Sequence, residues 1–315
     1  MRHLPRQAAL SIIGAVLLVA LVILFAPAPS GPTARATPTV TAPAGGPPSA
    51  PAAAATTSAA PAATAPASND AAAMLRAHND LRAATGAPPV RSDDRVSAAA
   101  QRHAEYLVRN ATGGHAETPG QPGFSGANVR DRLAAQGYDA PAASEVATSA
   151  AGTDGVRSLW VMPYHRLGLM HPHAIVAGWG YAESGGRRAT VGVIVYDFAS
   201  PAPEVVRSPG SGQREATLQW DGREDADVAP GAPRPLGYTV MAVWSRARAV
   251  TLRGSSITAG GRAIEHAVAP QIYERDYVAI VPLAPLASGT RYRVRLDVTV
   301  AGVDATEEWE FETGR

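Results

Sequence analysis

Residues 27–70 restrict the fold more than any other segment, because they hold almost nothing that could build a hydrophobic core. They contain ten prolines, many alanines and threonines, and only Arg35 and Asp70 as charged residues. A stretch of this composition buries too little apolar surface to offset the entropy lost on folding, and it stays extended. We therefore expect residues 27–70 to form a disordered linker, with the folded structure C-terminal to it.

The segment before this linker is predicted to associate with a membrane. Residues 8–26 are an uncharged run of 19 residues that follows Arg2, His3 and Arg6. A secretory signal core has about 7–15 apolar residues, whereas a membrane-spanning helix needs about 17–25. Residues 1–26 are therefore interpreted as a membrane anchor, with a cleaved signal peptide as the alternative. The preceding arginines favour a cytoplasmic N-terminus, so the remaining chain is expected to be exported and extracytoplasmic.

The composition excludes several classes of protein. The chain has no cysteine, which rules out disulfides, thiol nucleophiles, iron–sulfur clusters and cysteine-ligated zinc. An exported protein without disulfides has to be held together by packing. The formal net charge is +1, so the chain lacks the strong positive field that non-specific nucleic-acid binding requires. We expect no nucleic-acid partner.

Residues 71–200 are predicted to form a domain of helices followed by a β-hairpin. Apolar residues recur at three and four over the first two segments, and each segment ends at glycine. Two short helical pieces follow, the second ending before Pro163, and then two strands joined by a turn rich in Gly and Arg. This order favours an α+β or α-β-α layered domain. The first helix is expected to run from 71 to Gly86, and the second from the N-cap candidates at 92–94 to Gly113. The remaining expected elements are 129–136, 156–162, 175–181 and 189–198.

Residues 206–315 are predicted to form a second, all-β domain. Short alternating runs are separated there by turns rich in glycine or proline. Tyr292, Val294 and Leu296, for example, alternate with charged residues, as expected for a half-buried strand. Six or seven such strands in about 100 residues favour a small immunoglobulin-like sandwich. The expected strands are 216–220, 238–244, 249–258, 277–283, 291–300 and 307–313.

Three residues of the first domain are candidates for chemistry: His115, Glu145 and His165. Two imidazoles and a carboxylate suit a metal site, general acid–base catalysis or a hydrogen-bonded polar cluster. No His-x-x-x-His or Glu-x-x-His pairing joins them, so spacing alone does not make them neighbours. From the residues alone, unrelated polar positions remain the simpler interpretation.

The order of short motifs changes that interpretation. In sequence they are Leu75-Arg76-Ala77-His78-Asn79-Asp80-Leu81-Arg82, an Ala-rich helix with His103, Gly114-His115, Pro163-Tyr164-His165-Arg166-Leu167, Gly178-Trp179-Gly180-Tyr181 and the strand over 191–198. Over about residues 71–200 this order resembles the CAP superfamily, the SCP-like group of cysteine-rich secretory, antigen 5 and pathogenesis-related-1 proteins. The resemblance implies an α-β-α sandwich around a three-stranded sheet, with a cleft lined by two histidines and two acids. Bacterial members that it resembles are extracellular and cysteine-free.

The resemblance also assigns roles to individual residues. By position, His115 and His165 match the two cleft histidines, and Glu145 matches the acid of a Gly-Glu-Asn motif, which is Ser-Glu-Val here. Asp154 is assigned as the second acid, with Glu117 as the alternative. The implied metal ligands for Zn²⁺ or Mg²⁺ are His115, His165, Glu145 and Asp154, and the residues implied to contact another ligand are His115, Glu145 and His165.

The other histidines are interpreted as structural. His171 and His173 flank Pro172, a spacing that some zinc sites use, but a solvated loop is the preferred interpretation. His78 and His103 lie on helix faces rich in alanine and leucine. We expect both to be packing residues with one ring nitrogen hydrogen-bonded.

The preferred function from the sequence is binding rather than turnover. We expect an envelope-tethered protein whose cleft holds a divalent metal and a lipid or cell-wall-related ligand. Its partners would be the cell envelope or a small apolar ligand, and the membrane through residues 8–26. The alternatives are a metal-assisted hydrolase acting on peptidoglycan, peptide or lipid, and a structural adhesion module. The second domain is expected to be a spacer or rigid support.

Overall fold

The computed structural model describes residues 68–224, 226–245 and 249–315. The predicted anchor over residues 1–26 and almost all of the predicted linker over 27–70 lie outside these residues. Within the described ranges, no helix is long and apolar enough to cross a membrane.

The α+β part, residues 68–200, is built from five helices and a three-stranded antiparallel sheet in its described residues. The strands lie in the order β1-β3-β2, and β3 pairs with both neighbours. The helices are α1 (Ala71–Thr85), α2 (Asp94–Asn110), α3 (Val129–Ala135), α4 (Gly152–Val161) and α5 (Pro163–Met170), and the strands are β1 (Ala142–Thr148), β2 (Ala174–Ser184) and β3 (Arg187–Tyr196).

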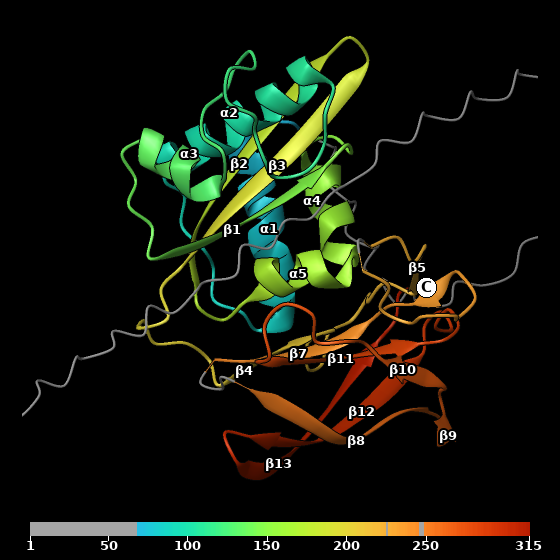
Figure 1. Ribbon diagram of the computed structural model, residues 1–315. Coiled ribbons are helices and arrows are strands. Elements are labelled where there is room, and N and C mark those ends of the chain that lie inside the picture. Colours follow the sequence, from blue (N-terminus) through green and yellow to red (C-terminus); the bar gives the residue numbers. More distant parts are fainter. Residues whose placement is uncertain (1–67, 225, 246–248) are drawn as a thin grey trace, which may run out of the picture. The chain divides into compact units, whose positions relative to one another are not determined.

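The sheet lies between two layers of helices, as Figure 1 shows. On one face, α2 and α3 pack against Val191, Val193 and Val195 of β3. On the other face, Ile194 and Trp179 share a core with residues of α1, α4 and α5. Because strand side chains alternate between faces, Glu145 of β1, which pairs with Val193, belongs to the α2 face. The predicted α-β-α arrangement is confirmed.

Two glycines allow α2 to lie directly on β2. A Cβ atom on Gly178 would stand 2.4 Å from the backbone nitrogen of Ser97, and one on Gly180 would stand 2.4 Å from the Cα atom of Gln101. These glycines are therefore required for the close approach of the helix to the sheet.

The sequence-based elements are largely confirmed, with two corrections. Pro163 was expected to end the helix before it. It does end α4, but it also begins α5, because proline has the right φ for a first helical position and loses no hydrogen bond there. The strand β1 was not expected from the residue pattern. Its two neighbours in the sheet were predicted, and they form a hairpin whose turn at 184–187 lies within the turn expected over 183–188.

The β part, residues 205–315, contains two four-stranded antiparallel sheets and a small two-stranded one in its described residues. The first sheet has the order β10-β11-β7-β4 and the second β13-β12-β8-β9. The strands are β4 (Val205–Ser208), β5 (Gln219–Trp220), β6 (Leu236–Gly237), β7 (Val240–Trp244), β8 (Val250–Ala259), β9 (Arg262–Ala263), β10 (His266–Val268), β11 (Tyr277–Pro282), β12 (Arg291–Val300) and β13 (Val303–Glu312).

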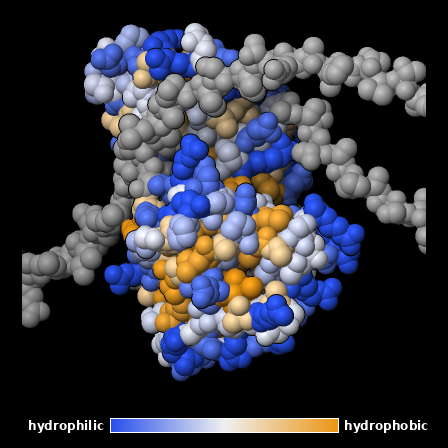
Figure 2. All heavy atoms as spheres, turned by 90° about the vertical axis from the view of Figure 1, so that its right-hand side faces the viewer, coloured by the Kyte–Doolittle hydropathy of each residue, from blue (hydrophilic) through white to orange (hydrophobic). Residues whose placement is uncertain are grey.

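The two large sheets enclose one apolar core, which makes the β part a sandwich, as predicted. Val240, Ile280, Val294 and Phe311, from both sheets, belong to this core. Figure 2 shows that hydrophobic side chains also gather on one surface of the molecule. Val268 of β10 and Ile272 are among the exposed large apolar residues of the β part.

A further apolar core joins the two parts. Met74, Leu159 and Tyr164 of the α+β part belong to the same buried cluster as Met241 and Tyr277 of the β part. Burial of apolar surface is the main favourable term in folding, so each part stabilises the other through this shared core.

Candidate functional site

The candidate site is centred on His115, which lies in a loop after two glycines. Its side chain is nearly buried, with 7% of its surface exposed. The Nδ1 atom lies 3.0 Å from Oε1 of Glu145. Because an ionised carboxylate only accepts hydrogen bonds, Nδ1 carries the hydrogen. The other ring nitrogen, Nε2, has no hydrogen-bond partner among the described residues.

Helix α3 holds Glu145 from the other side through Arg132. Asn128 caps the helix by accepting hydrogen bonds from the backbone N–H groups of Arg130 and Asp131. Arg132 is fully buried and donates from Nη2 to Oε2 of Glu145 at 2.7 Å and to the carbonyl oxygen of His115 at 3.1 Å. One guanidinium therefore fixes both the carboxylate and the loop that carries the histidine.

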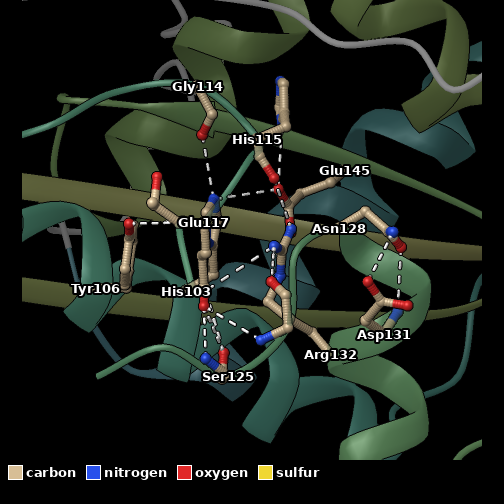
Figure 3. A network of polar contacts seen from close by, with 12 residues as sticks. His103, Tyr106, Gly114, His115, Glu117, Ser125, Asn128, Asp131, Arg132 and Glu145 are labelled. Carbon is tan, nitrogen blue, oxygen red and sulfur yellow. Dashed lines mark hydrogen bonds and ion pairs between the residues drawn. The ribbon is translucent and has the colours of Figure 1, made fainter. Parts of the chain in front are cut away.

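A second imidazole–carboxylate pair lies beside the first, as Figure 3 shows. His103 of α2 lies with Nδ1 2.9 Å from Oε1 of Glu117, and with Nε2 3.1 Å from the carbonyl oxygen of Gly114. Its Nε2 is also 3.3 Å from Oε1 of Glu145. Every one of these partners is an acceptor, so both ring nitrogens of His103 face oxygen atoms.

Glu117 is held by the loop that follows it. It accepts hydrogen bonds from the backbone N–H groups of Ser125 and Gly126 and from the Ser125 hydroxyl. Gly126 has a φ of 156°, and a Cβ atom there would stand 2.6 Å from the backbone nitrogen of Arg132. This glycine therefore lets the loop and α3 come together over the site.

The network holds two carboxylates in a buried place. Glu117 and Glu145 lie beside the guanidinium of Arg132 and the imidazole of His103. Burial raises the pKa of Glu145, but the charges of His103 and Arg132 outweigh that effect and lower it to about 2. Burial likewise raises the pKa of Glu117, and its hydrogen bonds from His103 and Ser125 bring it below the usual value. Both acids are therefore ionised at neutral pH.

His165, predicted as the second cleft histidine, has a different partner. It lies in the first turn of α5, and its Nδ1 is 2.7 Å from Oε1 of Glu224 in the β part. Both side chains are fully buried. α5 packs beside Ser144 and Tyr196, whose side chains lie on the face of the sheet opposite to Glu145. The described contacts thus join His115 to Glu145 and join His165 to Glu224.

The predicted second acid, Asp154, lies away from this network. It is in the first turn of α4, its side chain is mostly exposed, and it forms an ion pair with Arg157 at 3.0 Å. Its alternative, Glu117, is the acid found inside the network. No three His, Asp or Glu side chains among the described residues are arranged to hold a metal ion. Binding of Zn²⁺ or Mg²⁺ by His115, His165, Glu145 and Asp154 stays a prediction.

The expectation of a solvated loop at His171 and His173 was wrong. Both residues are buried. His171 lies with Nε2 3.1 Å from Oδ2 of Asp276, and His173 donates from Nε2 to the carbonyl oxygen of Ser245 at 2.9 Å. Both histidines bond residues of the β part. The local sequence could not indicate this contact.

Two residues of the network had no functional role in the sequence interpretation. His103 was expected to pack with one nitrogen satisfied, whereas both its nitrogens face acceptors. Arg132 was not considered, although an arginine in the middle of a short amphipathic helix and on its buried side is an available signal. His78 does follow the expectation: it is buried and its Nε2 lies 3.0 Å from the carbonyl oxygen of Leu169.

The arrangement presents one oriented imidazole nitrogen rather than a nucleophile. Ser125 donates its hydroxyl to Glu117, and the hydroxyl of Ser144 pairs with that of Tyr196. Neither serine is bonded to a histidine in the described structure, so the serine–histidine–acid geometry of hydrolases is not present at these two residues. What the site offers is the Nε2 atom of His115, which can accept a hydrogen bond or bind a cation.

A protein-family model covers most of the α+β part. Residues 75–197 match the model of the Cysteine-rich secretory protein family, CAP. The chain carries a CAP domain. This domain contains His103, His115, Glu117, Glu145 and His165, while Glu224 lies outside it.

Solved structures are also similar to part of this chain. An extracellular protein containing a SCP domain from Bacillus anthracis str. Ames is 15% identical with a TM-score of 0.34, and the match covers 40% of each chain. An outer surface protein of Borrelia burgdorferi is 17% identical with a TM-score of 0.33, over 40% of this chain and 90% of that one. The venom allergen-like protein 4 of Schistosoma mansoni is 12% identical with a TM-score of 0.28, over 40% and 87%. No curated protein matches the sequence.

Proposed function

We propose that this protein is an exported, envelope-tethered binding protein whose CAP domain contacts its ligand through His115. The observation that carries the proposal is the Nε2 atom of His115: it is buried, it has no partner among the described residues, and the carboxylate of Glu145 fixes the ring. A buried polar atom without a partner costs free energy. A ligand that donates a hydrogen bond to Nε2 removes that cost.

The surrounding network supports a binding role. Glu145 holds Nδ1 of His115, and Arg132 bonds both Glu145 and the carbonyl oxygen of His115, so the imidazole is held in one orientation before any ligand arrives. Preorganisation of this kind increases affinity because little side-chain entropy is lost on binding. The envelope location in the proposal rests on the apolar run over residues 8–26 and on the Pro-rich segment after it. The ligand class that suits this location is a lipid or a cell-wall fragment.

A divalent cation is the second candidate for the same atom. Histidines that bind metals usually donate their other N–H to a carboxylate, and His115 and Glu145 have this relation. With His115 as protein ligand, the bound molecule or solvent would complete the coordination. A metal-assisted hydrolase would then need an ordered nucleophilic water beside the cation, and a purely structural module would need neither ligand nor cation.

The proposal is tested by ligand-induced stabilisation of the full chain. A ligand present at 100 times its Kd raises the free energy of unfolding by about 2.7 kcal/mol. We expect lipid or peptidoglycan fragments, or Zn²⁺, to raise the melting temperature of the wild type and not that of His115→Ala. The matched control is His266→Ala, which changes a histidine of β10 in the β part.

The screen also separates the candidates. Stabilisation by Zn²⁺ alone favours the cation at Nε2, and stabilisation by a metal-free fragment favours the small ligand. The proposal fails if every compound that stabilises the wild type stabilises His115→Ala equally. Release of product from peptidoglycan, peptide or lipid during the same incubations would show that the protein is a hydrolase rather than a binding protein.

A further inference from the structure

Helix α5 of the CAP domain has no cap of its own. Its N-cap residue is Met162, whose side chain makes no capping hydrogen bond. The first N–H groups of a helix have no partner within the helix, and leaving them unbonded in a buried place is costly. A group from elsewhere in the chain must therefore complete this helix end.

That group is the carboxylate of Glu224, which follows strand β5 in the β part. Its Oε2 accepts a hydrogen bond from the backbone N–H of Tyr164 at 2.9 Å. Its Oε1 lies 2.7 Å from Nδ1 of His165, and both side chains are fully buried. A buried carboxylate is expensive unless it is paired and hydrogen-bonded, and here both oxygens are engaged by the first turn of α5. A negative charge is also favoured at a helix N-terminus.

The neighbours of His165 in α5 are held by the β part as well. Tyr164 donates its hydroxyl to the carbonyl oxygen of Pro270 at 2.9 Å. Arg166 donates from Nη2 to the carbonyl oxygen of Thr239 at 2.7 Å, and its guanidinium lies 4.1 Å from the ring centre of Tyr238. Three successive residues of α5 thus take their polar partners from outside the family segment over 75–197.

We propose that Glu224 is a positioning residue of the CAP domain, through which the β part sets the orientation and the tautomer of His165. Because the carboxylate only accepts, it keeps a hydrogen on Nδ1 and turns Nε2 inward, where that atom has no partner among the described residues. The relation repeats the one between Glu145 and His115. The β part is then more than a spacer, since it supplies the acid for the second histidine of the CAP domain.

The test is the imidazole spectrum of the full chain by ¹H–¹⁵N NMR, with His165→Gln to assign the resonances. In the wild type we expect a hydrogen on Nδ1 of His165, deshielded by the bond to Glu224. In Glu224→Gln, which keeps the shape and removes the charge, this resonance shifts upfield, and the Tyr164 amide exchanges its hydrogen faster with solvent. The control Glu204→Gln changes an exposed glutamate directly before strand β4 and leaves both signals unchanged.

An unchanged Nδ1 resonance of His165 in folded Glu224→Gln overturns the proposal. So does a wild-type spectrum with the hydrogen on Nε2 and none on Nδ1, which decides the matter even if Glu224→Gln does not fold. Neither readout involves a ligand, so the outcome is independent of whether His115 binds one.

Discussion

Replacing Arg132 by methionine is expected to lower the free energy of unfolding by about 3–5 kcal/mol, the usual cost of removing one partner from a buried ion pair. The substitution leaves Glu145 buried without the guanidinium that bonds its Oε2, and it removes the donor to the carbonyl oxygen of His115. Chemical denaturation of the full chain at neutral pH measures the loss. The matched control is Arg102→Met, because Arg102 is exposed on α2.

The dependence on pH identifies the carboxylate as the source of the loss. The pKa of Glu145 is about 2 in the folded protein and 4.5 ordinarily, so its ionised form stabilises the fold fully above pH 4.5. This contribution disappears as the pH falls from 4.5 towards 2. The difference between wild type and Arg132→Met should shrink over the same range. A difference that stays constant over that range would mean that lost packing, rather than the unpaired charge, causes the destabilisation.

Gly180→Ala is the second substitution with a large expected effect. A Cβ atom there would stand 2.4 Å from the backbone nitrogen of Gln101 and 2.6 Å from the carbonyl carbon of Ala100. Backbone atoms of a helix cannot rotate away, so α2 has to move off β2. Overpacking usually costs about 1–3 kcal/mol, and we expect a loss at the upper end of that range. Thermal and chemical denaturation both measure it.

A glycine in another strand provides the control for this substitution. Gly254 of β8 has the nearest atom to its Cβ position, Oδ2 of Asp297, at 3.5 Å, an ordinary contact distance. Gly254→Ala should leave the stability nearly unchanged. Equal losses for the two substitutions would show that replacement of a strand glycine, and not the approach of α2, is responsible.

Local sequence patterns predicted the elements whose burial follows a regular period. The two long helices and the β2–β3 hairpin have one apolar face or a continuous apolar run, and glycines mark their ends. The strand β1 was not predicted, because Glu145 occupies a buried position at which an alternating strand pattern would have an apolar residue. Its charge is paired by Arg132, which lies 13 residues away in the chain, and a period calculated along one strand cannot show such a partner.

The candidate site was predicted only in part, because some of its contacts join residues that lie far apart in the sequence. The family resemblance brought His115 and Glu145 together, because both lie in motifs whose order is visible in the sequence. Glu224, which pairs with His165 across 59 residues, lies outside those motifs. The pairing of His103 on both nitrogens also depends on the loop that returns Gly114 and Glu117 to α2. Long-range contacts of this kind are set by the tertiary fold and carry no local pattern.

The most direct test of the account is the ¹H–¹⁵N spectrum of the His115 imidazole in the full chain, recorded before and after addition of Zn²⁺, with His115→Gln to assign it. The account predicts a hydrogen on Nδ1, held by Glu145, and none on Nε2. A shift or broadening of the Nε2 resonance on addition of Zn²⁺ would identify the cation, the second candidate, as the ligand of this atom. A ring with its hydrogen on Nε2 and none on Nδ1 would contradict the account.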